Sequence, residues 1–538
     1  MNHLRGTVLF IIFISATLLW NACNNSSPKT IDAKLHDTAS SEQSEKDLSL
    51  PGSFSSQTEL HFDSTQINLF ISRYPLFKLL QTDIQKFYQS RNYAYAWYDT
   101  KGIIEQADNL YNKMMNISEE GLPETILYKD SLMRIFDDTV STQIPENELM
   151  LTSQYFDYAN KVWRGISEKQ SKSLNWFIPR KKLDVLSLMD SMLKDTSSSF
   201  IKNGYSHRQY NLLKEYLQQY RTLDQQNNWA EIKTNSKSFR KGDKSETIIA
   251  IRQRLNLLGD LPVNSSSTFF DQGLEDAVKN FQSRFGMKID GVIGKEMIKQ
   301  LNIQPENYIR QIIVNMERCR WVPNSLDKDY LVVNIPAFTL TAYEKDSVVF
   351  SMNVVVGQTV HKTVIFNGDL KYIVFSPYWN VPPDILKKEI LPGIKKDPNY
   401  LSKHNMEWNG KTVRQKPGPD NSLGLVKFLF PNEYHIYLHD NPAKSLFNEH
   451  VRAFSHGCIR VANPKKLASY LLRKNPEWTE EKIDRAMKSG KEQYVTLKDE
   501  VPVYIAYLTA WVDRTGRLNL RKDIYNRDNR LEAMILKN

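Results

Sequence analysis

The chain has 538 residues, too many for one hydrophobic core, so three or four folded units are expected. Hydrophobic residues make up 41% of the sequence and charged residues 25%, which excludes collagen-like and wholly disordered proteins. The net charge of +10 is mild over this length and raises nucleic acid, anionic lipid and acidic polymers as partners. The three cysteines, Cys23, Cys319 and Cys458, exclude a disulfide framework and a four-cysteine zinc site.

The first 22 residues have the pattern of an export signal. A short basic start is followed by an apolar run over residues 7–20, which is shorter than the roughly 20 residues that span a bilayer. Ala22 and Cys23 come next, and the arrangement resembles a bacterial lipoprotein signal with Cys23 as the lipidated first residue. An uncleaved anchor and a soluble secreted protein are the alternatives, and all three export the protein.

A linker and a helical region follow the signal. Residues 23–67 are predicted to be a disordered linker, because such a polar, Ser-rich stretch cannot bury a core. From residue 68 apolar residues recur every three or four positions, as in Leu80, Ile84 and Phe87, so residues 68–235 are expected to form a helical scaffold domain. Its aromatic stripes could stack on sugars, but their helical spacing favours a core.

Residues 236–305 are expected to form a compact three-helix bundle. Ile248 and Leu255 lie on one apolar face, and glycines fall at helix ends and turns. Short motifs such as Phe281-Gln282 and Asp290-Gly291 resemble those of the peptidoglycan-binding module of many cell-wall enzymes. The resemblance implies glycan binding, and the alternative is a helical spacer that keeps the fold without binding glycan.

The carboxy-terminal part changes to β-type patterns. Residues 306–329 are predicted to be a connecting helix, and its Cys319 has no nearby histidine and is most simply a packed residue. From residue 330 apolar and polar residues alternate as in strands. We therefore expect a mostly β domain over residues 330–530 and a tail over residues 531–538. The predicted fold class is multidomain α+β.

The residues that suggest chemistry lie close together in this domain. Residues 434–438 are predicted to be a strand, which places Tyr437 and His439 on one face. Nineteen residues after His439 comes Cys458, within Ser455-His456-Gly457-Cys458-Ile459-Arg460. A free cysteine has a pKa near 8.5, so catalysis needs a base beside the thiol.

Two histidines could be that base, His439 from an adjacent strand and His456 from the same segment as the thiol. Gly457 lets the backbone turn so that N–H groups face a developing oxyanion. The alternative to a catalytic site is an inert buried thiol with a loop histidine.

His439 and the string that contains Cys458 resemble the signature of the L,D-transpeptidases. The likeness extends to Asn315-Met316-Glu317-Arg318 and to residues 378–382 and 501–513, as in the large subfamily that joins a helical scaffold, a peptidoglycan-binding module and a catalytic domain. The resemblance implies a capping insertion over the cleft at about residues 384–423. Cys319 departs from the pattern, because a Trp commonly stands there.

The resemblance also implies a mechanism. Cys458 would attack the third residue of a stem tetrapeptide, expel the terminal D-Ala and form a thioester, which the amine of a second stem would resolve into a 3-3 cross-link. His439 would be the base. The N–H groups of Gly457 and Cys458, with the Tyr437 hydroxyl as a weaker candidate, would stabilise the oxyanion. His456 would hold the local geometry, and Arg460 would either pair with a substrate carboxylate or brace the loop.

Other functions stay open at this point. They are an L,D-carboxypeptidase or other acyl-enzyme hydrolase of the same fold, and a non-catalytic wall-binding lipoprotein. A papain-like protease is disfavoured because Cys458 follows both histidines in chain order. The expected partners are peptidoglycan and, through a lipid on Cys23, a membrane at the periplasmic side of the cell envelope. No metal, organic cofactor or nucleic acid is expected.

Overall fold

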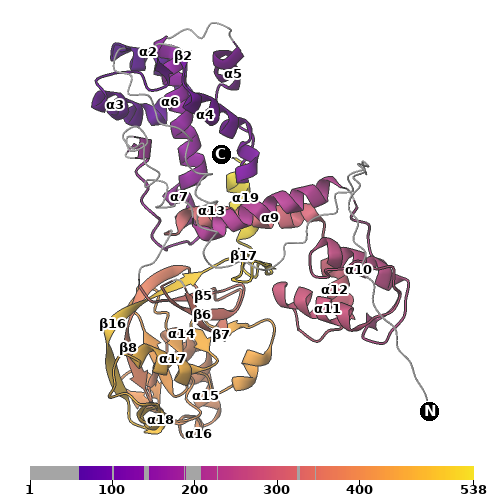
Figure 1. The fold of residues 1–538 in the computed structure, drawn as a ribbon. Helices are drawn as coiled ribbons and strands as arrows, with labels where there is room; N and C mark the ends of the chain where they lie inside the picture. Colours follow the sequence, from indigo (N-terminus) through magenta and orange to yellow (C-terminus); the bar gives the residue numbers. More distant parts are fainter. Residues whose placement is uncertain are drawn as a thin grey trace, which may run out of the picture. The chain divides into compact units, whose positions relative to one another are not determined.

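The computed structural model of the chain describes residues 60–99, 102–137, 144–186, 188–189, 207–226, 228–323, 328–345 and 347–537. Within these ranges the buried apolar residues form four clusters, which correspond to a helical part, a central part, a β-rich part and a small cap (Figure 1). No helix in the same ranges is long and apolar enough to cross a bilayer. The predicted export signal and Cys23 lie outside the described residues.

The helical part consists of short helices whose apolar faces meet in one core. Its elements are α2 (Thr65–Arg73), η1 (Pro75–Leu80), α3 (Gln81–Ser90), β1 (Tyr98–Asp99), β2 (Gly102–Ile103), α4 (Glu105–Met115), η2 (Ile117–Glu120), α5 (Lys129–Asp137), α6 (Pro145–Ala159) and η3 (Asn160–Arg164). Helix α7 (Glu168–Ser173) follows, and the residues that flank it, Ile166 and Leu174, belong to the core of the β-rich part. Tyr155, Tyr158 and Trp163 are buried in this core, which confirms the core interpretation of the aromatic stripes. The folded region begins before the predicted residue 68, since Ile67 of α2 is already buried.

The central part contains the predicted three-helix bundle. Its elements are α9 (Arg208–Gln225), β3 (Ser238–Phe239), α10 (Thr247–Leu257), α11 (Gln272–Arg284), β4 (Ile293–Gly294), α12 (Lys295–Leu301), α13 (Pro305–Trp321), β17 (Ala510–Val512) and β18 (Leu518–Leu520). Leu213 and Leu217 of α9 belong to this core rather than to that of the helical part, and α9 lies alongside α13 (Figure 1). Cys319 of α13 is buried, as predicted, and burial raises the pKa of its thiol to about 12.

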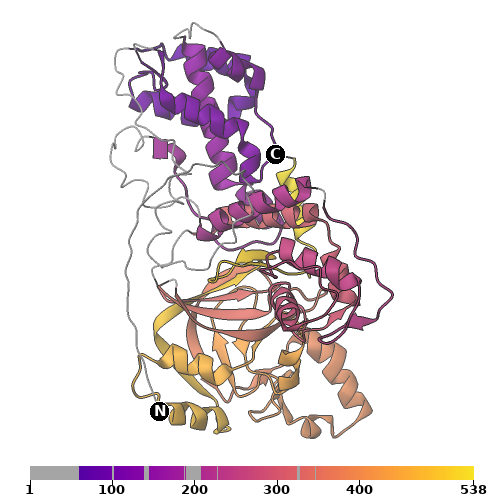
Figure 2. The same ribbon diagram turned by 45° about the vertical axis from the view of Figure 1, so that its right-hand side comes forward.

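The β-rich part is a nine-stranded mixed sheet that curves back on itself (Figure 2). Its strands are β5 (Tyr330–Asn334), β6 (Thr339–Glu344), β7 (Ser347–Gly357), β8 (Phe366–Phe375), β12 (Val426–Leu429), β13 (Leu438–His439), β14 (Ala453–Ser455), β15 (Ile459–Val461) and β16 (Gln493–Ala506). Their order is β14-β7-β15-β13-β12-β8-β16-β5-β6, and a further pairing of β6 with β7 closes the ring. Helices α17 (Pro464–Leu472) and α18 (Glu480–Lys488) contribute to the same core.

The cap is the predicted insertion between β8 and β12. It consists of β9 (Trp379–Asn380), α14 (Pro383–Ile385), η5 (Leu386–Ile390), α15 (Leu391–Lys396), α16 (Tyr400–Lys403), β10 (Met406–Asn409) and β11 (Thr412–Gln415). Val381, Ile390, Met406 and Val413 form a small core of its own. The hairpin β10–β11, which pairs with β9, was not indicated by the sequence.

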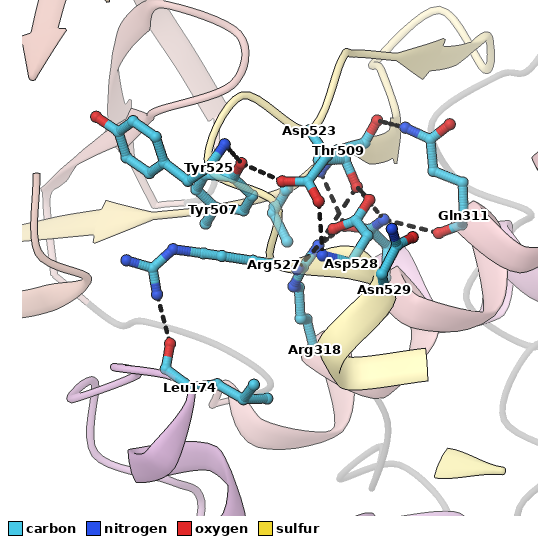
Figure 3. A network of polar contacts seen from close by, with 12 residues as sticks. Leu174, Gln311, Arg318, Tyr507, Thr509, Asp523, Tyr525, Arg527, Asp528 and Asn529 are labelled. Atoms are coloured by element: carbon cyan, nitrogen blue, oxygen red, sulfur yellow. Dashed lines mark hydrogen bonds and ion pairs between the residues drawn. The ribbon is translucent and has the colours of Figure 1, made fainter. Parts of the chain in front are cut away.

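The end of the chain is folded, so the predicted tail over residues 531–538 is wrong. Helix α19 (Asp528–Ile535) buries Leu531 and Ile535 in the core of the β-rich part. Figure 3 shows the polar network at its start, where Asp528 pairs with Arg318 of α13 at 2.7 Å and accepts a hydrogen bond from the Thr509 hydroxyl, also at 2.7 Å.

The same network continues towards the β-rich part. The Tyr525 N–H donates to the Tyr507 hydroxyl at 2.9 Å, and that hydroxyl donates to Asp523 (Figure 3). The Tyr525 hydroxyl in turn donates to the Gly357 carbonyl at the end of β7 at 2.6 Å. Helix α13 and strand β7 are therefore joined through the carboxy-terminal segment.

Candidate active site

One face of the sheet carries a row of polar side chains. In strands β15, β13 and β12 every second side chain packs in the core of the β-rich part. The side chains between them face the other way, and they are those of Arg460, His439 and Lys427. The strand register pairs His439 with Arg460 on one side and with Lys427 on the other. Paired residues of neighbouring strands point to the same face, so the three side chains lie side by side.

Next to the pair of His439 and Arg460 on this face lie Tyr437 and Cys458, which carries the thiol. Cys458 directly precedes β15, where the Ile459 N–H donates to the Tyr437 carbonyl at 3.2 Å. The ring centroids of Tyr437 and His439 are 5.7 Å apart, which confirms that these two residues share a face. Cys458 is therefore the immediate neighbour of Tyr437, and in the described residues no hydrogen bond joins its thiol to His439.

The predicted strand over residues 434–438 is wrong, because β13 contains only Leu438 and His439. The preceding segment turns instead. The Asn432 side chain accepts hydrogen bonds from the Tyr434 and Ile436 N–H groups at 3.0 and 3.2 Å. His435 has a φ of 54°, in the left-handed region, so the segment cannot be extended at this point.

The Cys458 thiol is partly buried and lies beside a backbone carbonyl. Its Sγ lies 3.8 Å from the His435 carbonyl oxygen, to which it donates. Burial raises the pKa of the thiol, while the hydrogen bonds from Tyr437 and the charge of Arg460 act in the opposite direction. A base beside this thiol would favour the thiolate that attacks an acyl carbon.

His439 is buried and neutral. Burial, with the nearby charges of Arg460 and Lys427, lowers its pKa to about 3. Its Nδ1 lies 2.5 Å from the Asp440 carbonyl oxygen, and the Leu423 carbonyl also approaches the ring. A carbonyl can only accept, so Nδ1 carries the hydrogen and the basic lone pair is on Nε2.

The turn before the thiol is held by hydrogen bonds on both sides. Gly457 has a φ of 117°, which favours glycine, and its N–H donates to the Ser455 hydroxyl at 3.1 Å. Its carbonyl accepts from the Thr363 hydroxyl at 2.9 Å. The Gly457 N–H is therefore engaged in this structure, whereas the Cys458 N–H meets no acceptor among the described residues.

His456 occupies a different place from the one predicted. Its side chain is 51% exposed, and its ring packs on His361 with centroids 4.8 Å apart. Its Nε2 lies 3.8 Å from a carboxylate oxygen of Glu389 in the cap. Within the described residues it makes no hydrogen bond that would hold the cysteine turn, so Ser455 and Thr363 fill the role that was expected of His456.

Arg460 makes one long hydrogen bond in the described part of the site. One of its terminal nitrogens lies 3.4 Å from the Asn441 side-chain oxygen, at the long end of the range for hydrogen bonds. Its Nε is buried without a partner among the described residues. Both predicted roles, substrate contact and loop support, therefore remain predictions.

A cavity of about 310 Å³ lies beside His435 and Tyr437, and Cys458 is not part of its lining. Its lining is mostly aromatic and consists of Tyr372, Leu429, Phe430, Pro431, Asn432, His435, Ile436, Tyr437 and Tyr494. No group of His, Cys, Asp or Glu side chains that could hold a metal ion occurs in the part of the chain that the structure describes.

Sequence reasoning missed Thr363 and Lys427. Thr363 lies in a loop between β7 and β8 and reaches Gly457 across 94 positions of sequence, so no local pattern could reveal it. Lys427 carried a signal, because a lysine between apolar residues of a strand must face away from the core.

Family comparisons match three segments of the chain. Residues 328–503 match the L,D-transpeptidase catalytic domain, residues 82–217 a scaffold domain, and residues 244–301 a domain described as "putative peptidoglycan binding domain". The catalytic match contains Cys458, His439 and Lys427.

Similar proteins agree with this assignment. A curated protein of Haemophilus influenzae, named "putative L,D-transpeptidase", is 32% identical over 246 residues, which cover 42% of this chain and 49% of the relative. The chain thus spans about half the length of the curated relative it matches.

Solved structures were also found. L,D-transpeptidases of Xylanimonas cellulosilytica and Stackebrandtia nassauensis are 14% and 15% identical. They cover 51% of this chain each and 100% and 97% of their own chains, with TM-scores of 0.18 and 0.23. Scores this low add nothing to the fold described above. Taken together, the three matches show that the chain combines an L,D-transpeptidase catalytic domain with a scaffold domain and a peptidoglycan-binding domain.

Proposed function

We propose that this protein is an L,D-transpeptidase that forms 3-3 cross-links in peptidoglycan through a cysteine acyl-enzyme. One observation carries the proposal: within the matched catalytic domain, Cys458 adjoins the Tyr437 hydroxyl and shares a sheet face with a neutral His439. A thiol, a hydroxyl donor and an unprotonated imidazole are the groups that acyl transfer through sulfur requires.

In the first step the Cys458 sulfur attacks the carbonyl carbon of the third stem residue. Burial disfavours both the thiolate and the imidazolium, so we place proton transfer and attack in the same step. The thiol must leave the His435 carbonyl, and its proton passes to His439 as the carbon–sulfur bond forms. The Cys458 N–H and the Tyr437 hydroxyl are the donors for the oxyanion, since the Gly457 N–H already binds Ser455.

In the second step the carbonyl re-forms and the bond to the terminal D-Ala breaks. His439 returns its proton to the departing amine, which leaves a thioester on Cys458. The side-chain amine of a second stem then attacks the thioester carbon and loses a proton to His439. The carbon–sulfur bond breaks, and the sulfur takes that proton to restore the thiol. If water attacks instead, the product is a tripeptide stem, and the enzyme is an L,D-carboxypeptidase.

The other domains support peptidoglycan as the partner. The match of residues 244–301 to a peptidoglycan-binding domain and of residues 82–217 to a scaffold domain fits an enzyme held at the cell wall. We propose that it works in the cell envelope on the periplasmic side, with a lipid on Cys23 as its membrane anchor.

The test is incubation of the full chain with disaccharide tetrapeptides, followed by mass spectrometry of the products. The proposal predicts dimers with a 3-3 linkage and release of D-Ala, both abolished by Cys458→Ala. Cys319→Ala is the matched control, because it removes a thiol that lies in α13 and should leave the dimers unchanged. Tripeptides without dimers would favour hydrolysis, and an unmodified substrate would favour a non-catalytic wall-binding protein.

A further inference from the structure

Lys427 is a charged residue on the floor of the site with no assigned role. It lies on β12, pairs in register with His439 on one side and with Val374 of β8 on the other, and is partly buried. Its alternation with core residues directs its side chain to the same face as His439. Its charge is one of those that lower the pKa of His439, after burial and the charge of Arg460.

No carboxylate forms an ion pair with Lys427 among the described residues. The acidic group that acts on it is Glu492, just before β16, and an oxygen of that carboxylate already accepts the Tyr378 N–H at 2.9 Å. Burial lowers the pKa of Lys427, while Glu492 acts in the opposite direction. A partly buried ammonium without a contacting partner is costly for the fold, which suggests that a ligand supplies the partner.

Arg460, on the other side of His439, also lacks an ion-pair partner among the described residues, and its buried Nε lacks an acceptor there. Neighbouring strands are about 4.8 Å apart, so Lys427 and Arg460 start from positions roughly 10 Å apart with His439 between them. Side chains of this length can converge over the imidazole from both sides.

We propose that Lys427 and Arg460 bind a carboxylate of the donor stem peptide above His439. This inference rests on the proposed function, and it names Lys427 as a specificity-determining residue of that site. A carboxylate fits because it accepts hydrogen bonds from an ammonium and from a guanidinium at once. A neutral sugar or an amide would leave both charges uncompensated.

The bound carboxylate also connects binding with catalysis. Arg460 and Lys427 both disfavour the protonated form of His439. A substrate anion between them offsets their charges, so His439 accepts the thiol proton more readily when the donor is in place. Binding of a donor peptide that carries this carboxylate thereby raises the basicity of His439.

The test measures binding of synthetic stem tetrapeptides to the full chain that carries Cys458→Ala, by titration calorimetry. One peptide has all its carboxylates free, and each of the others has one carboxylate converted to the amide. Lys427→Met, which keeps the side chain's length and removes its charge, should raise Kd for the free peptide by about tenfold. Lys427→Arg should restore binding to within about threefold of the parent.

The control is Lys371→Met on β8, whose ammonium pairs with Glu500 at 2.8 Å and which should change Kd less than about twofold. For the one peptide that lacks the bound carboxylate, Lys427→Met should have no further effect, and this peptide identifies which carboxylate is held. An unchanged Kd for the free peptide, an equal loss for every peptide, or no binding to the parent would overturn the inference. The binding measurement does not depend on turnover. If the peptide binds as expected but the unsubstituted chain makes no cross-links, the proposed function is refuted and the carboxylate site stands.

Discussion

Removal of the Thr363 hydroxyl should loosen the turn that presents the thiol. Thr363 is fully buried, and its hydroxyl donates to the Gly457 carbonyl and accepts from the Gly357 N–H, each at 2.9 Å. Thr363→Val keeps the shape of the side chain and leaves both backbone groups without this partner. An unsatisfied buried polar group costs about 1–3 kcal/mol, so for two such groups we expect a loss of about 2–6 kcal/mol in unfolding free energy.

Part of that loss should appear in the reaction. A deficit of 1.4 kcal/mol in the positioning of Cys458 slows a step about tenfold, so we expect acylation to slow by at least about tenfold. The assay is the rate of carbapenem adduct formation on Cys458, followed by intact-protein mass spectrometry, with thermal unfolding measured in parallel. Thr363→Ser keeps the hydroxyl and should retain most of the rate. Thr341→Val, at an exposed hydroxyl pair with Ser351, is the control for loss of a hydroxyl elsewhere. Equal acylation rates in Thr363→Val and the parent would refute the assigned role of this contact.

Three further outcomes are expected. Burial lowers the pKa of His439 to about 3 from an ordinary 6.5, so the native state is destabilised as pH falls from about 6.5 towards 3, where only the unfolded state takes up this proton. His439→Gln should flatten that decline by up to about 1.4 kcal/mol per pH unit in urea unfolding at a series of pH values, and an unchanged slope would count against a buried neutral imidazole. Iodoacetamide should label Cys458 and spare Cys319 in the folded protein, because Cys319 is only 3% exposed and burial raises its pKa to about 12; labelled Cys319 in a peptide map would contradict this placement. A fragment of residues 228–305 should unfold at a lower temperature than one of residues 207–323, because α9 and α13 share its core, and coincident transitions would show that the bundle does not need them.

The parts of the site that sequence predicted are those encoded by short local patterns. The string around Cys458 and the spacing to His439 are local, and they predicted the glycine turn and the L,D-transpeptidase catalytic domain that residues 328–503 match. The helical bundle over residues 236–305 was predictable for the same reason, since its apolar spacing and helix-end glycines are read along one segment.

The remaining features depend on contacts between distant segments. Strand pairing places Lys427 beside His439, and the fold brings Thr363 under Gly457, but neither contact leaves a local pattern. His456 was expected to support the turn because it adjoins Cys458 in sequence, yet its ring points to His361 and the cap. The predicted tail failed because helix α19 is short, and its tertiary contacts with the core of the β-rich part stabilise it more than its own sequence does.

The central claim is that Cys458 carries the acyl group during transfer between stems. Its most direct test is to mix the full chain with tetrapeptide stems, quench within the first turnover and map the modified peptide by mass spectrometry. The proposal predicts a thioester-linked tripeptide stem on Cys458, which decays into cross-linked dimers when an acceptor amine is added. Dimers that form with no acyl group on Cys458, or a thioester that the acceptor amine never resolves, would contradict it.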